Sequence, residues 1–72
     1  MNKQRLQRAN NLKERLQIIQ EELEEIIAEE ESYKDNIPEN MGRRFEQAEE
    51  ALESMNDALT NLTEAIDALE SL

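Results

Sequence analysis

"KDNIPENMGRR" (residues 34–44) is the only stretch of this chain whose residues oppose a continuous helix. Pro38 has no amide hydrogen and disfavours the helical conformation at the residue before it, while asparagine and glycine accept turn conformations. Four such residues fall within seven positions, which favours a chain reversal over the alternative, a proline kink in one long helix. Asn40 or Gly42 is expected to cap the helix that follows. The predicted loop spans residues 37–42, and the residues expected to form the turn are Asn36, Ile37, Pro38, Met41 and Gly42.

The segment before the loop has apolar residues at alternating intervals of three and four, the pattern of a helix that packs along a seam. We predict a helix over residues 3–36. Leu6, Ile18 and Ile27 fall outside the predicted seam, so this helix carries more apolar surface than one partner helix can cover. The predicted seam residues are Ala9, Leu12, Leu16, Ile19, Leu23 and Ile26.

The segment after the loop repeats one seven-residue unit, and we predict a second helix over residues 43–71. The three copies of the unit cover residues 50–56, 57–63 and 64–70. A row of alanines (Ala51, Ala58 and Ala65) lies beside the predicted core and widens the apolar surface of the helix. The predicted core residues of this helix are Phe45, Leu52, Met55, Leu59, Leu62, Ile66 and Leu69, together with Ala48.

These features predict an all-α fold, an antiparallel helical hairpin that forms a single domain over residues 1–72. A loop this short places the two helices side by side. A chain of 72 residues buries only a small core, and oligomerisation is the remaining source of stability when disulfides and metals are absent. We therefore expect two hairpins to form a homodimeric four-helix bundle. Its core is expected to contain Leu12, Leu16, Ile19, Leu23 and Ile26 with the core residues of the second helix.

The composition argues against catalysis and cofactor binding. The chain has no cysteine and no histidine, so it lacks thiolate ligands and the commonest general base. Glu21 and Glu24, like Glu46 and Glu49, have the spacing of bundle carboxylates, but the Glu-x-x-His unit of di-iron bundles cannot be built. We expect no catalytic residue, no metal site, no cofactor and no enzymatic activity. No apolar run approaches the ~18 residues of a membrane span, so we expect a cytoplasmic protein without membrane contact.

Charge is distributed unevenly in a chain whose net charge is −10. Residues 1–15 carry five cations and one glutamate, whereas residues 46–72 carry eight acids and no base. The basic segment either pairs with acidic residues of the bundle or binds an outside partner, and both readings stay open. An acidic chain repels nucleic acid at long range, and no aromatic residue accompanies the cations to stack on bases. The residues of a candidate partner surface are Arg5, Arg8, Arg15, Glu50, Asp57 and Glu64.

The loop motif resembles one found in a group of small uncharacterised proteins of bacteria and their phages. The motif is Asp-Asn-aliphatic-Pro-Glu between an acidic helix with an aromatic residue and a helix of Ala/Glu/Leu repeats. Residues 35–41 match it, within a similarity that covers residues 32–72. The group continues with a glutamine and a serine, where this chain has Gly42, Arg43 and Arg44. The resemblance implies a bacterial or phage origin and a helical hairpin, and it implies no activity.

The expected function is that of a non-enzymatic interaction or assembly module, which associates with itself and serves as an accessory or regulatory part of a larger bacterial or phage complex. Two alternatives use the charged segments. In one, the acidic rows mimic a nucleic acid and inhibit a nucleic-acid-binding protein. In the other, a hairpin dimer binds RNA or DNA through the basic N-terminal segment, an interpretation that the net charge disfavours.

Overall fold

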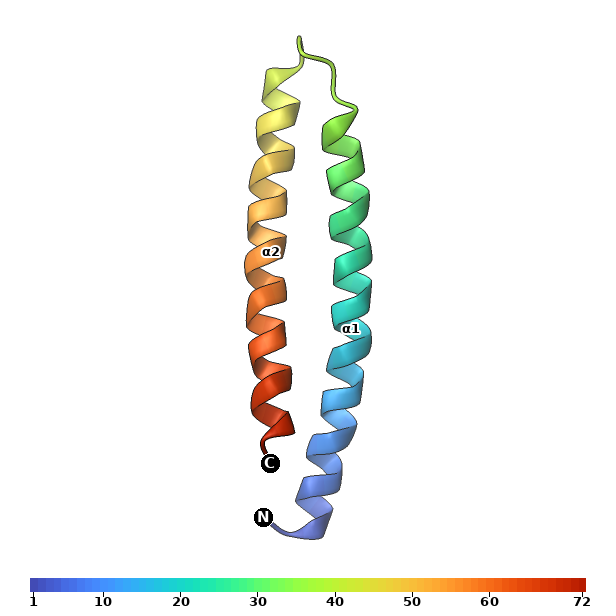
Figure 1. Cartoon of the computed structure of the whole chain (residues 1–72), viewed down its shortest axis with the longest axis vertical. Helices are drawn as coiled ribbons and strands as arrows, with labels where there is room; N and C mark the ends of the chain where they lie inside the picture. The colour runs from blue at the N-terminus through green and yellow to red at the C-terminus, as the bar shows by residue number, and fades with distance from the viewer.

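A computed structural model describes all residues 1–72 and confirms the all-α helical hairpin (Figure 1). Helix α1 covers Lys3–Asp35 and helix α2 covers Gly42–Glu70. The two helices run antiparallel beside each other, and both chain ends lie at the end of the hairpin opposite the loop (Figure 1). The molecule is a thin rod with extents of 59 × 15 × 12 Å. Helix α1 ends one residue before the predicted boundary at residue 36, and α2 begins one residue before residue 43.

Asparagine side chains close both ends of α1. The Oδ1 atom of Asn2 accepts a hydrogen bond of 2.8 Å from the backbone N–H of Arg5, so Asn2 caps the N-terminus of the helix. At the other end Asn36 is the C-cap, and its Nδ2 atom donates a hydrogen bond of 2.8 Å to the carbonyl oxygen of Ser32. These bonds satisfy backbone groups that have no partner within the helix.

The loop closes through its backbone and begins α2 without a side-chain cap. The backbone N–H of Met41 donates to the carbonyl oxygen of Pro38 at 3.0 Å, and Met41 is the N-cap residue of α2. The expectation that Asn40 or Gly42 caps α2 is therefore wrong. The physical reason is that the Pro38–Met41 turn leads directly into the helix, which puts an apolar residue at the cap position. No residue in the loop has a positive φ angle.

Replacing Gly42 with alanine is expected to stabilise the hairpin. Gly42 is the first residue of α2, its φ angle is negative, and an added Cβ would meet no atom within 4 Å. Alanine restricts the unfolded chain without strain in the folded one, a gain of about 0.4–1 kcal/mol. Thermal melting should rise by roughly 2–8 °C. Ala28→Gly, the reverse change at an exposed position of α1, should lower the melting temperature. A lower melting temperature for Gly42→Ala would contradict the helical start described above.

The seam between the two helices uses a different set of α1 residues from the one predicted. One predicted row, Ala9, Leu16 and Leu23, is at least partly buried against α2. The second row lies one position later than predicted. Its members are Leu6, Lys13, Gln20, Ile27 and Lys34, all of them buried or half-buried.

Two predictions about α1 are therefore wrong. Ile27 is 7% exposed and Leu6 is half-buried, although both were expected to lie outside the seam. Ile26 is 51% exposed, and Leu12 and Ile19 are also exposed, although all three were expected within it. The reason is that α2 covers the row of Leu6, Gln20 and Ile27 on one side of the Leu16 row, and the more apolar row on its other side stays exposed. The lysines and the glutamine can take part in the seam because their long stems are apolar.

One polar contact sets the alignment of the helices. The Nε2 atom of Gln20 donates a hydrogen bond of 2.8 Å to Oγ1 of Thr63, and that hydroxyl donates in turn to the carbonyl oxygen of Leu59 at 2.9 Å. In an antiparallel pair, residues at the same level have residue numbers with a constant sum. The pair Gln20 and Thr63 therefore identifies which residues of α1 and α2 lie opposite each other along the whole rod.

The hairpin has very little core of its own. Only four of the 72 residues are buried, and they are Ile27, Ala48, Leu52 and Ile66. The other predicted core residues of α2 are half-buried, except for Phe45 at the loop end, which is exposed. The Nζ atom of Lys34 lies 5.6 Å from the centre of the Phe45 ring, within the range of a cation–π contact.

Candidate protein-protein interface

A row of large apolar side chains runs along α1 outside the seam. Its members recur every seven residues, so they lie above one another on one side of the helix. All four are between 49% and 51% exposed. The row consists of Leu12, Ile19, Ile26 and Tyr33.

A row of smaller apolar residues runs along α2 outside the seam. Ala51, Ala58 and Ala65 are exposed at the same seven-residue spacing, and Leu72 continues the row beyond the end of the helix. Small residues in such a row allow another helix to approach the backbone closely. The alanine row therefore offers contact surface with little side-chain bulk.

Both rows lie on the same side of the hairpin. Successive residues of an α-helix are 100° apart. On α1 the direction midway between Leu16 and Gln20 faces α2, and Ile19 lies about 80° from that direction. On α2 the direction midway between Leu52 and Met55 faces α1, and Ala51 lies about 70° from it, turned in the same sense. Because the helices are antiparallel, equal turns in the same sense bring both rows to one side. We call these two rows together the apolar face.

The opposite side of the hairpin is polar. The same count places one row of α1 and one row of α2 there, and neither contains an apolar residue. We call these rows the polar face, and their members are Asn10, Gln17, Glu24, Glu31, Glu49, Asn56, Thr63 and Glu70. The hairpin is thus amphipathic as a unit, with one side suited to water and one side suited to a partner.

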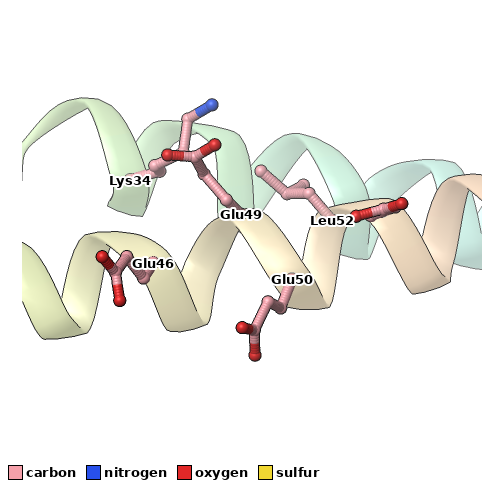
Figure 2. A pocket seen from close by; sticks show the side chains of 6 residues that line it. Lys34, Glu46, Glu49, Glu50 and Leu52 are labelled. Atoms are coloured by element: carbon pink, nitrogen blue, oxygen red, sulfur yellow. The ribbon is translucent and has the colours of Figure 1, made fainter.

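An acidic groove of about 440 Å³ opens on the polar side near the loop. Four of its six lining residues are glutamates, with Lys34 and Leu52 completing it. Glu50 points away from α1, whereas Leu52 points toward it (Figure 2). The structure contains no group of three acidic residues arranged to hold a metal ion. The groove is therefore a surface between exposed glutamates, without a convergent set of ligands.

A second groove, of about 300 Å³, lies at the basic end of α1 and is lined by Arg8, Asn11, Leu12 and Arg15. It includes two of the three arginines of the predicted partner surface, and all three arginines are exposed. Leu12 at its edge belongs to the apolar face, so these arginines flank that face. The acidic residues of the predicted partner surface are exposed on α2, pointing away from α1, and are Glu50, Asp57 and Glu64.

The surface area of the chain is large for its mass. Folded monomeric proteins of 8.4 kDa expose about 4,600 Å². This hairpin exposes 5793 Å². The excess of roughly 1,200 Å² is more than the ~800 Å² that one partner buries in a standard protein–protein interface.

No known protein family, curated protein or solved structure matches this chain. Neither helix contains a stretch that is long and apolar enough to span a membrane.

Proposed function

We propose that this protein is a non-enzymatic interaction and assembly module that associates with itself through the apolar face, forming a homodimeric four-helix bundle. The observation that carries the proposal is the apolar face itself, four large and several small apolar side chains left exposed on a hairpin that buries only four residues. A two-helix hairpin of this size gains most of its stability from burying such a face.

The apolar face also explains the pattern of polar residues. A second hairpin over the apolar face would cover Leu12, Ile19 and Ile26, the predicted bundle-core residues that α2 leaves exposed. The exposed residues of the polar face would stay in water. For the wider role we propose an accessory or regulatory subunit of a larger complex, bacterial or phage in origin, a proposal supported by the resemblance of the loop motif.

Sedimentation equilibrium of the full chain tests the proposal. We expect twice the chain mass of 8.4 kDa at micromolar concentrations, with dissociation on dilution accompanied by loss of helix signal. A helical monomer that keeps its stability at every concentration would overturn self-association.

Neutralising the outer acidic row of α2 separates this function from the mimicry of nucleic acid. The triple variant Glu50→Gln, Asp57→Asn and Glu64→Gln changes exposed side chains that point away from α1. We expect its dimer dissociation constant to stay within about threefold of the parent value, because exposed charges contribute little. Sedimentation equilibrium at physiological salt measures this. A monomeric triple variant would show that these residues lie within the interface.

A further inference from the structure

The apolar face has an internal asymmetry that bears on how a second copy would lie on it. All of its large side chains within the helices belong to α1, and its alanines all belong to α2. The alignment set by Gln20 and Thr63 places Ile19 within one residue of the level of Ala65. Ile26 and Ala58, and likewise Tyr33 and Ala51, match to the same degree. Each of these three levels therefore has one large residue beside one small residue, whereas Leu12 lies near the level of Leu72 at the end of the rod.

Two symmetric arrangements can pair such faces. With the two-fold axis parallel to the helices, α1 of each copy lies against α2 of the other, and both loops lie at the same end. With the axis perpendicular to the helices, α1 lies against α1 and α2 against α2, and the loops lie at opposite ends. Closed two-fold pairing is the commonest symmetry of small homodimers, so the choice lies between these two.

Side-chain size favours the first arrangement. A parallel two-fold axis preserves the level of every residue, so Ile19 meets Ala65 of the second copy and Ile26 meets its Ala58. Large residues then fill the space above alanines, as close packing requires. In the second arrangement Ile19 meets Ile26 on one side while alanine rows meet on the other, which makes the interface wide at one edge and narrow at the other.

Charge favours the same arrangement. The row of α1 that borders the apolar face is charged, with Arg8, Arg15, Glu22 and Glu29. The row of α2 that borders it has no charge, and its members are Gln47, Ser54, Asn61 and Ala68. Placing α1 against α2 of the second copy therefore brings charged residues beside uncharged ones, and no like charges meet.

We call the second arrangement, with the loops at opposite ends, the opposite-end arrangement, and the first the same-end arrangement. In the opposite-end arrangement Arg15 would gain Glu29 of the second copy as a neighbour, but Glu22 would face its own counterpart near the two-fold axis. The two α2 helices would also lie side by side, each with eight acids and no base over residues 46–72. Like charges at this spacing destabilise an interface. In the same-end arrangement these two acidic helices are diagonal to each other, and each has α1 helices as neighbours.

We propose that two copies of this chain pair by their apolar faces about a two-fold axis parallel to the helices, with both loops at one end of the bundle. This arrangement rests on the proposed self-association and adds the orientation of the second copy. It creates a tip at which two copies of the segment "DNIPENM" (residues 35–41) lie next to each other. The four chain ends lie together at the far end.

Distances between spin labels test the orientation. The chain has no cysteine, so Asn40→Cys, in the exposed loop, and Ser71→Cys, near the opposite end, each introduce one labelling site. In the same-end dimer, Asn40→Cys labels lie within roughly 30 Å of each other, since neighbouring helix axes are 8–10 Å apart. In the opposite-end dimer they lie apart by nearly the full 59 Å length of the rod.

A mixed sample provides the control. Combining Asn40→Cys chains with Ser71→Cys chains gives a long distance in the same-end dimer and a short one in the opposite-end dimer. A long Asn40-to-Asn40 distance with a short mixed distance would overturn the orientation while leaving self-association intact. A monomeric mass with no distance between chains would overturn both proposals.

Discussion

Replacing Leu59 with aspartate is expected to abolish most of the helical signal of the chain at room temperature. Leu59 is half-buried in the middle of the seam between α1 and α2. The change removes up to about 1.5–3 kcal/mol of apolar burial and puts an unpaired carboxylate in a partly buried position, which costs roughly 2 kcal/mol or more in addition. A core of this size supplies only about 3–5 kcal/mol in total. The balance therefore favours the unfolded chain.

The neighbouring residue provides a matched control. Thr60 is exposed, and its hydroxyl donates only to the carbonyl oxygen of Asn56 on the same helix at 3.1 Å. Thr60→Asp introduces the same charge one residue away, outside the seam. Far-ultraviolet circular dichroism of both variants during heating makes the comparison. We expect Thr60→Asp to melt within a few degrees of the parent, and a cooperative, parent-like melt of Leu59→Asp would contradict the position of the seam.

Replacing Ile19 with serine is expected to weaken dimer formation strongly while the equivalent change at Ile18 does not. The two isoleucines are adjacent and similarly exposed in the hairpin, at 49% and 57%. Ile19 belongs to the apolar face, whereas Ile18 points away from α2 on the outer side of α1. If the second copy covers the exposed half of Ile19 in both chains, its loss removes about 2–3 kcal/mol per dimer. The dimer dissociation constant then rises roughly 30- to 150-fold.

Sedimentation equilibrium over a dilution series measures both constants. Ile18→Ser should leave the constant within about threefold of the parent, because its side chain stays in water in monomer and dimer alike. Equal weakening by the two variants would mean that the contact between copies does not use the apolar face. No weakening by Ile19→Ser would carry the same conclusion.

The two helices and the reversal between them could be predicted from local residue chemistry. Pro38 and the nearby asparagines stop a helix. The seven-residue units of α2 identify its inner side, because within the helix its other rows are polar or have alanine as their only apolar residue. The cap formed by Asn2 also follows a known residue preference, although the apolar pattern did not point to it.

The side of α1 that turns toward α2 could not be predicted in the same way. The row through Leu16 has Ile19 on one side and Gln20 on the other, and a count of apolar residues favours Ile19. Such a count does not reveal whether a row is covered by the chain itself or left for a second one. The recurrence of Leu6, Lys13, Gln20, Ile27 and Lys34 every seven residues was the available signal, and it was hidden because three of the five are polar.

Lys13, Gln20 and Lys34, the polar residues of the α1 row in the seam, favour one alignment of the two helices over others that the repeated units of α2 would allow. Three similar units would accept α1 at positions that differ by one unit, since leucine or isoleucine recurs at each step. At the observed alignment Lys13 is level with Glu70, Gln20 with Thr63, and Lys34 with Glu49. Residues of opposite charge are therefore level with each other near both ends of the hairpin, and the hydrogen-bonded pair Gln20 and Thr63 lies between them.

If α1 is shifted along α2 by one seven-residue unit in one direction, Ile27 becomes level with Glu49. If it is shifted by one unit in the other direction, Gln20 becomes level with Glu70 and Lys13 lies beyond the end of α2. Each slipped hairpin loses the Gln20–Thr63 bond and at least one match of opposite charges. Polar groups inside a seam act in this way in coiled coils, where they specify the alignment at some expense of stability. Three polar side chains of α1 therefore distinguish the observed alignment from shifted alignments that the apolar residues alone would leave nearly equal in energy.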